Sequence, residues 1–223
     1  MGMNRFKYTA QLLAERVGSI AAKRATVGFD GYTDELLHVV EHRQNAENYQ
    51  PFQTIRDFGT AIAGNAGSSG LEIVTKAVKV GGNGPILAEA LARLGLPVTC
   101  VGLFGWPETA EVFSRMSPNC ELISMGQPAH TLAFEFTDGK LMFGRHENLN
   151  GITWKTLVER VGVNRLRQYY AQSDLVGITN WSEMIHANDL WNGILLHCMP
   201  EADLKRDRYI FFDLADPIKR AEG

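Results

Sequence analysis

The spacing of apolar residues along the chain predicts helices that alternate with short strands. Apolar residues recur at helical spacing and predict an amphipathic helix over residues 9–23. A stronger helix is predicted from Pro85 to Gly95, where glycine and then proline close an apolar face. Further helices are predicted to start at Pro51 and at Pro107 and to cover residues 154–170 and 190–196.

Short apolar runs rich in β-branched and aromatic residues predict the strands. They cover residues 26–29, 36–40, 71–80, 98–103, 175–178 and 209–212. A hairpin is also predicted, because residues 131–136 and 141–143 flank Asp138-Gly139, a dipeptide typical of tight β-turns. Strands separated by helices are typical of an α/β fold with a mainly parallel sheet, and the hairpin indicates a small β appendage on it.

Length and composition indicate a single globular domain over residues 1–223. The 24.7 kDa chain is 45% hydrophobic and 21% charged, which excludes a disordered or fibrous protein. Its net charge of −3 argues against nucleic-acid binding through a basic surface. No apolar run is long enough to span a membrane, so no membrane partner is expected. The three cysteines form no CxxC pair and indicate a cytoplasmic location without a disulfide framework.

Several common catalytic signatures are absent from the sequence. The only Gly-Lys pair, Gly139-Lys140, lies in the predicted hairpin turn, so the chain has no phosphate-binding P-loop. No GxGxxG, HExxH or GxSxG string occurs either. Dinucleotide-binding enzymes, zincins and α/β-hydrolases therefore lose support.

Two carboxylates follow the first predicted strand. Asp30 and Asp34 stand just beyond its end in the segment 28–34. Ligands of open α/β sheets bind outside the carboxyl ends of the strands, where such acids can accept hydrogen bonds from substrate hydroxyls. On this segment alone, a turn acid that caps local backbone N–H groups is the slightly favoured interpretation.

A cluster of glycines precedes the strongest predicted helix. In Gly81-Gly82-Asn83-Gly84-Pro85, four of the five residues are glycine or proline, more than a helix cap needs. Glycine lets a ligand approach the backbone, and the N–H groups at the helix start suit oxygen acceptors. We therefore interpret Gly82 and Asn83 as binding residues.

The last predicted strand also delivers polar residues. Asp213 and Asp216 follow it, and then Arg220. These side chains could line a cleft at the strand ends, although a solvated turn before a helix explains the pattern nearly as well.

These segments together resemble the ribokinase, or PfkB, family of carbohydrate kinases. Residues 81–95 resemble its first glycine signature, and residues 27–34 resemble its early strand that ends in an acid. The hairpin 131–144 resembles the family's lid strands, and residues 212–220 resemble its Asp-x-Asn-x-Arg region. The resemblance runs along nearly the whole chain.

The resemblance implies a doubly wound, mainly parallel sheet flanked by helices, with a small β lid that covers the sugar. Lid strands are expected at about 35–41, 71–80 and 130–146. Asp34, or Asp30 because the loop is spaced unusually, would bind sugar hydroxyls together with Gly82 and Asn83, and Arg220 is a further candidate. The family also implies ATP and Mg²⁺, and we expect a homodimer that forms through the lid, where Leu132, Phe134 and Phe136 share one strand face.

The second family signature, Gly-Ala-Gly-Asp, does not occur in the sequence. In the family it supplies the anion hole and the general base, so we expect no catalytic residue within these 223 residues and a fold that lacks its C-terminal part. The ATP and Mg²⁺ sites should be largely missing with it. Three interpretations stay open: the N-terminal portion of a sugar kinase, a non-catalytic protein that binds sugars or nucleosides, and a structural module that dimerises through the lid.

Overall fold

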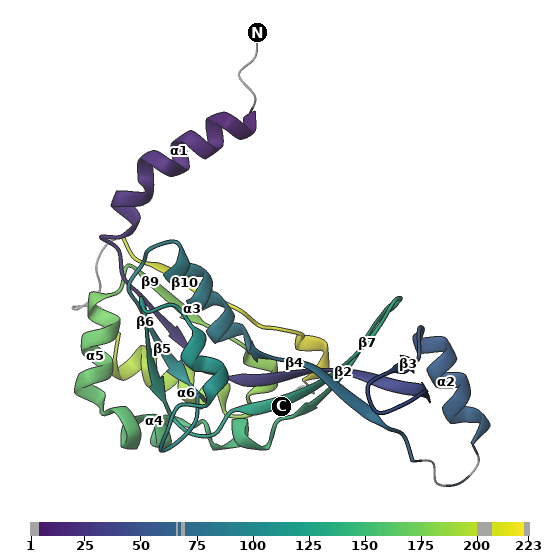
Figure 1. The fold of residues 1–223 in the computed structure, drawn as a ribbon. Coiled ribbons are helices and arrows are strands. Elements are labelled where there is room, and N and C mark those ends of the chain that lie inside the picture. Colours follow the sequence, from purple (N-terminus) through teal and green to yellow (C-terminus); the bar gives the residue numbers. More distant parts are fainter. Residues whose placement is uncertain (1–4, 66, 68–69, 200–206, 221–223) are drawn as a thin grey trace.

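A computed structural model describes residues 5–65, 67, 70–199 and 207–220. Its centre is a parallel sheet with the strand order β10-β9-β1-β5-β6 (Figure 1). The strands are β1 (Ala25–Gly28), β5 (Val98–Gly102), β6 (Cys120–Ser124), β9 (Leu175–Ile178) and β10 (Tyr209–Phe212). The parallel α/β sheet predicted from the sequence is confirmed, and β6 is a strand that the sequence analysis missed.

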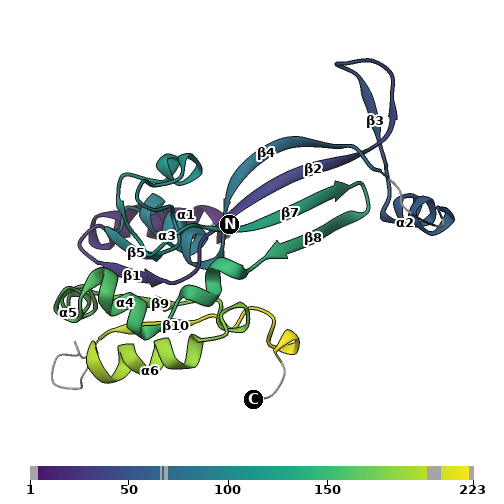
Figure 2. The same ribbon diagram turned by 90° about the horizontal axis from the view of Figure 1, so that it is seen from below.

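Helices cover both faces of this sheet (Figure 2). Helix α3 (Asn83–Arg93) lies on one face, where Val27 and Cys100 pack against Ala88. The other face is covered by α4 (Trp154–Val161), α5 (Val163–Gln172) and α6 (Ala187–His197). Along β1, β5 and β9 the side chains alternate between the two faces, so the sheet separates two hydrophobic cores. All four residues of the edge strand β10 are exposed.

A second sheet extends from the first as a long, curved lid (Figures 1 and 2). Its strands are β2 (Tyr32–Arg43), β3 (Tyr49–Pro51), β4 (Ile73–Gly81), β7 (Ala129–Phe136) and β8 (Gly139–Arg145). Strand β2 pairs antiparallel with β4 and parallel with β7, and β7 forms the predicted hairpin with β8. Because β2 follows β1 after only three residues, the lid is rooted at the carboxyl end of the central sheet.

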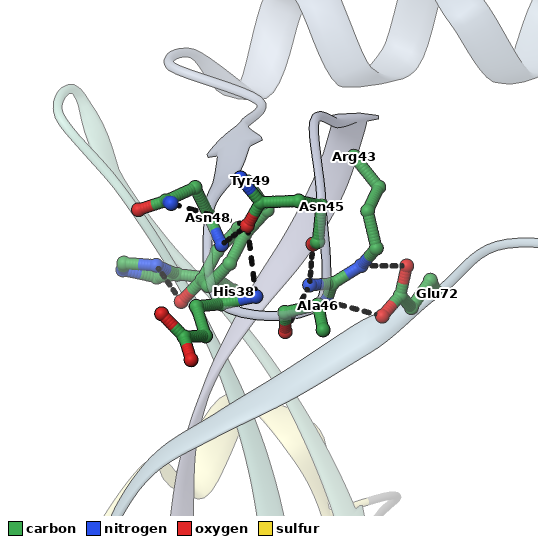
Figure 3. Close-up of polar contacts among 8 residues, drawn as sticks. His38, Arg43, Asn45, Ala46, Asn48, Tyr49 and Glu72 are labelled. Atoms are coloured by element: carbon green, nitrogen blue, oxygen red, sulfur yellow. Dashed lines mark hydrogen bonds and ion pairs between the residues drawn. The ribbon is translucent and has the colours of Figure 1, made fainter.

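The far end of the lid carries its own small core and polar contacts. Helix α2 (Ile55–Gly64) packs Phe58 against Phe136, with Phe52 and Val39 in the same cluster. Figure 3 shows the adjacent turn, where the Arg43 guanidinium is paired with Glu72 and donates to backbone carbonyls of the turn. These contacts hold the β2–β3 turn against β4.

Three predicted helices differ from the observed ones. Pro51 ends β3, and α2 begins after Thr54, whose hydroxyl caps the helix start. The predicted helix 154–170 is two helices, because Gly162 adopts φ 85° and ends the first helix before the second begins. After Pro107 only a short 3-10 turn forms, Glu111–Arg115.

The first helix, α1 (Arg5–Ile20), projects away from the rest of the chain (Figure 1). Further 3-10 turns are Glu147–Gly151, Trp181–Glu183 and Pro217–Lys219. The cysteines Cys100, Cys120 and Cys198 are buried free thiols. Among the described residues, no helix has the length and apolarity that a membrane span requires.

Candidate functional site

The carboxyl ends of the central strands meet the root of the lid at a cleft of about 530 Å³. Its lining comes from the lid, from the start of α3 and from the segments after β9 and β10. The residues that line it include Tyr32, Asp34, Thr131, Gly144, His146, Gly82, Asn83, Asn180, Glu183 and Asp216. A second hollow, of about 420 Å³, lies at the opposite ends of β1 and β5. We take the first as the candidate site, because open α/β sheets bind ligands beyond the carboxyl ends of their strands.

Asp30 is completely buried beneath the cleft. Its carboxylate accepts hydrogen bonds at 2.7 Å from the backbone N–H groups of Asn83 and Gly84, and at 2.7 Å from the Asn180 side-chain amide. The Thr179 hydroxyl lies 3.4 Å away. Burial raises the pKa of Asp30, while these four donors act in the opposite direction. Asp30 is therefore engaged in anchoring the start of α3, and it is not among the residues that line the cleft.

Asp34 does line the cleft. It lies two residues beyond Tyr32 on β2, and so on the same face of the strand. It is half-buried and accepts a hydrogen bond from the Thr131 hydroxyl on the neighbouring strand. Burial raises the pKa of this carboxyl above its ordinary value. Gly81 lies beside it, and a Cβ at that position would overlap the carboxylate. The glycine thus leaves room for Asp34 to point into the site.

The glycine cluster begins α3 as predicted and faces the cleft. Gly82 has φ 95°, a left-handed conformation that glycine adopts readily. The side-chain amide of Asn83 donates to Asp213 at 2.5 Å, and this contact ties the start of α3 to the segment after β10. Gly82, Asn83 and Asp34 are thus brought together, from parts of the chain about fifty residues apart.

Arg220 is not brought into the cleft. Its guanidinium donates to the backbone carbonyls of Trp181 and Ile185, at 2.8 Å and 3.2 Å, and stacks on the Trp181 ring at 4.1 Å. This arginine therefore holds the last described segment against the 3-10 turn after β9. Asp216, which follows the same strand, does line the cleft.

Sequence reasoning missed several residues of the site. Asn180 follows β9 in a left-handed conformation with φ 62°, and its Oδ1 is buried without a hydrogen-bond partner in the described structure. Tyr32, His146 and Glu183 form a second polar group, in which His146 Nδ1 lies 2.9 Å from the Tyr32 hydroxyl and 3.0 Å from a Glu183 oxygen. Burial and the negative charges of Asp30 and Glu183 raise the pKa of Tyr32. The one available signal was position, since Asn180 lies two residues beyond the predicted strand 175–178.

The family of the chain is shown by comparison with known sequences. The family model described as prokaryotic ketohexokinase matches residues 9–219. The chain belongs to the prokaryotic ketohexokinase family. A curated relative, the ketohexokinase of Haloferax volcanii, is 33% identical over 174 residues, which are 77% of this chain and 46% of the relative. The chain thus spans about half the length of this relative.

Solved structures agree with this family in fold. A carbohydrate kinase from Agrobacterium tumefaciens is 16% identical and matches with a TM-score of 0.58 over 88% of this chain and 55% of its own. A fructokinase from Xylella fastidiosa is 12% identical, with a TM-score of 0.53 over 91% of this chain and 54% of its own. These likenesses confirm the ribokinase-like fold that the sequence resemblance implied.

ATP and a metal ion are implied by the kinase family, and the described residues do not form a site that fits the metal. No group of three or more His, Cys, Asp or Glu side chains suited to hold a metal ion occurs within the described ranges. The Asp34 carboxylate, which lines the cleft, accepts a hydrogen bond from Thr131, and the buried Asp30 carboxylate beneath the cleft accepts hydrogen bonds from the start of α3.

Proposed function

We propose that this chain forms the sugar-binding part of a kinase that transfers a phosphoryl group from ATP to a hydroxyl of a ketohexose. The observation that carries the proposal is the cleft between the lid and the carboxyl ends of the parallel strands, where Asp34 and the start of α3 converge. The family match and the name of the curated relative favour a ketohexose among the sugars.

In this proposal the two aspartates have different roles. Asp34 is reachable from the cleft, so its carboxylate accepts hydrogen bonds from sugar hydroxyls. Asp30 is buried and holds the backbone of Asn83 and Gly84, so it shapes the site from below. Gly82 and Asn83 then contact the sugar from the helix start.

Calorimetric titration of the 223-residue chain tests this proposal. We expect saturable binding of D-fructose, and weaker binding of an aldohexose such as D-glucose. Asp34→Asn should weaken D-fructose binding about tenfold or more, because a charged acceptor contributes about 1.5–3 kcal/mol. Binding that is absent for every ketohexose, or unchanged in Asp34→Asn, would refute the assignment of the cleft.

A homodimer through the lid is the second part of the proposal. The lid face that points away from Asp34 carries a row of paired residues, Val78, Glu35, Leu132 and Phe143. Val78 and Phe143 expose 46% and 56% of their surface. A second copy of the chain could cover this row. Phe134 and Phe136 contribute less to it than expected, because they pack against the lid's own core.

Sedimentation velocity tests the dimer. We expect Phe143→Lys to lower the dimer fraction, while Met142→Lys, on the opposite lid face, serves as the matched control. A Phe143→Lys variant that sediments as wild type would remove the lid face as the contact.

A further inference from the structure

His146 follows β8 directly and lies at the wall of the cleft. Its side chain is 39% exposed, and the ring is held at one nitrogen by two neighbours. Nδ1 lies 3.0 Å from a carboxylate oxygen of Glu183 and 2.9 Å from the Tyr32 hydroxyl. The ring also meets the Tyr32 ring edge-on, with 5.7 Å between centroids. The orientation of the imidazole is therefore fixed by neighbours in the cleft wall.

The contact with Glu183 determines which nitrogen carries the proton. An ionised carboxylate only accepts hydrogen bonds, so the contact with Glu183 places a proton on Nδ1, and the Tyr32 oxygen, 2.9 Å from the same nitrogen, then lies on the acceptor side of that N–H. A neutral imidazole protonated at Nδ1 keeps a lone pair at Nε2. In its neutral form, His146 therefore presents a hydrogen-bond acceptor at Nε2.

The position of Nε2 depends on Gly144. A Cβ at this glycine would overlap Nε2 of His146, so the ring occupies the space that a larger residue would fill. Gly144 is paired with Thr131 on β7, and Thr131 is paired with Asp34 on β2. Paired residues of neighbouring strands share one face of a sheet. Nε2 and the Asp34 carboxylate thus stand at opposite ends of one row across the cleft face of the lid.

We propose that Nε2 of His146 accepts a hydrogen bond from one hydroxyl of the bound sugar and makes His146 a specificity-determining residue. In this arrangement Glu183 is a positioning residue that keeps the proton on Nδ1. The inference rests on the proposed sugar-binding function and adds a second acceptor, opposite Asp34. The site should discriminate against a sugar that lacks the hydroxyl in contact with Nε2, because the acceptor would lose its partner.

Calorimetric titration with D-fructose and its monodeoxy analogues tests the contact. We expect wild type to bind one analogue about tenfold more weakly as a result of this contact, and His146→Phe to bind that analogue and D-fructose equally. The matched control is His130→Phe, since His130 is on β7 beside Thr131 but is not among the cleft residues. His130→Phe should keep the wild-type pattern.

Two further variants separate this role from a merely structural one. Gly144→Ala keeps the histidine at position 146 but should displace its ring, because the new Cβ would overlap it. This variant should therefore also lose discrimination against the deoxy analogue. Glu183→Leu should move the proton to Nε2, whereas Glu183→Gln retains an acceptor oxygen and should restore part of the discrimination. Long-range ¹H–¹⁵N spectra report the proton position, and His146→Phe identifies the signal.

The outcomes distinguish this inference from the proposed function. If wild type binds D-fructose and His146→Phe keeps the wild-type pattern for every analogue, His146 has no such role and the sugar site stands. A wild-type signal protonated at Nε2 would equally overturn the inference. Absence of any ketohexose binding by wild type would refute the proposed function and this inference with it. A His146→Phe chain that fails to fold leaves the decision to Gly144→Ala.

Discussion

Replacement of Asp30 should destabilise the fold far more than replacement of Asp34. The Asp30 carboxylate accepts three hydrogen bonds of 2.7 Å from two backbone N–H groups and the Asn180 amide, and it is completely buried. In Asp30→Ala these three donors lose their acceptor, and the donors of Gly84 and Asn180 are buried. The start of α3 also loses a negative charge at its positive end.

The expected cost follows from these contacts. Each buried donor left without a partner costs about 1–3 kcal/mol. Removal of a buried charge relieves its desolvation, which offsets part of this loss. We therefore expect Asp30→Ala to lower the free energy of unfolding by about 3–5 kcal/mol, the range seen when one partner of a buried charged contact is removed. For a chain of this size that is a fall in melting temperature of about 10 °C.

Urea unfolding followed by circular dichroism measures this cost, with Asp34→Asn as the matched control. Burial raises the pKa of Asp34, so its ionised form contributes no stability at neutral pH, and Asp34→Asn should unfold like wild type or slightly later. Asp30→Asn, which keeps one acceptor oxygen, should fall between the two. An Asp30→Ala chain as stable as wild type would show that the carboxylate does not anchor α3.

Three other predictions concern the cleft. Affinity for D-fructose should fall on acidification. The fall should begin above the ordinary aspartate pKa, because burial raises the pKa of Asp34. Calorimetry between about pH 4 and 8 should show this fall in wild type but not in Asp34→Asn. Gly82→Val should lower the free energy of unfolding by about 1–3 kcal/mol, because φ 95° is strained for valine and its Cβ would meet Pro85 and Tyr32. Thermal unfolding measures this change, and an unchanged midpoint would contradict the prediction. With ATP and sugars, residues 1–223 alone should release ADP at a rate far below ~1 s⁻¹, because no Gly-Ala-Gly-Asp string occurs among them. A coupled assay that measured turnover at that rate would reveal an unrecognised base.

The amino-acid pattern alone determined much of the central sheet. Strands β1, β5, β9 and β10 and helix α3 were predicted close to their observed bounds, because buried strands and amphipathic helices have local periods that a sequence displays directly. The hairpin β7–β8 was predicted from the Asp-Gly turn for the same reason. The glycine cluster before α3 also indicated a binding site from residue type and order.

Only the tertiary structure separated the two aspartates. Asp30 and Asp34 are four residues apart and alike in sequence, but one lies under α3 and the other faces the cleft. Likewise, His146 and Glu183 meet Tyr32 across more than a hundred residues, through the parallel pairing of β2 with β7 and the turn after β9. Hydrogen bonds between residues so distant in sequence depend on which strands become neighbours, and no local period records that choice.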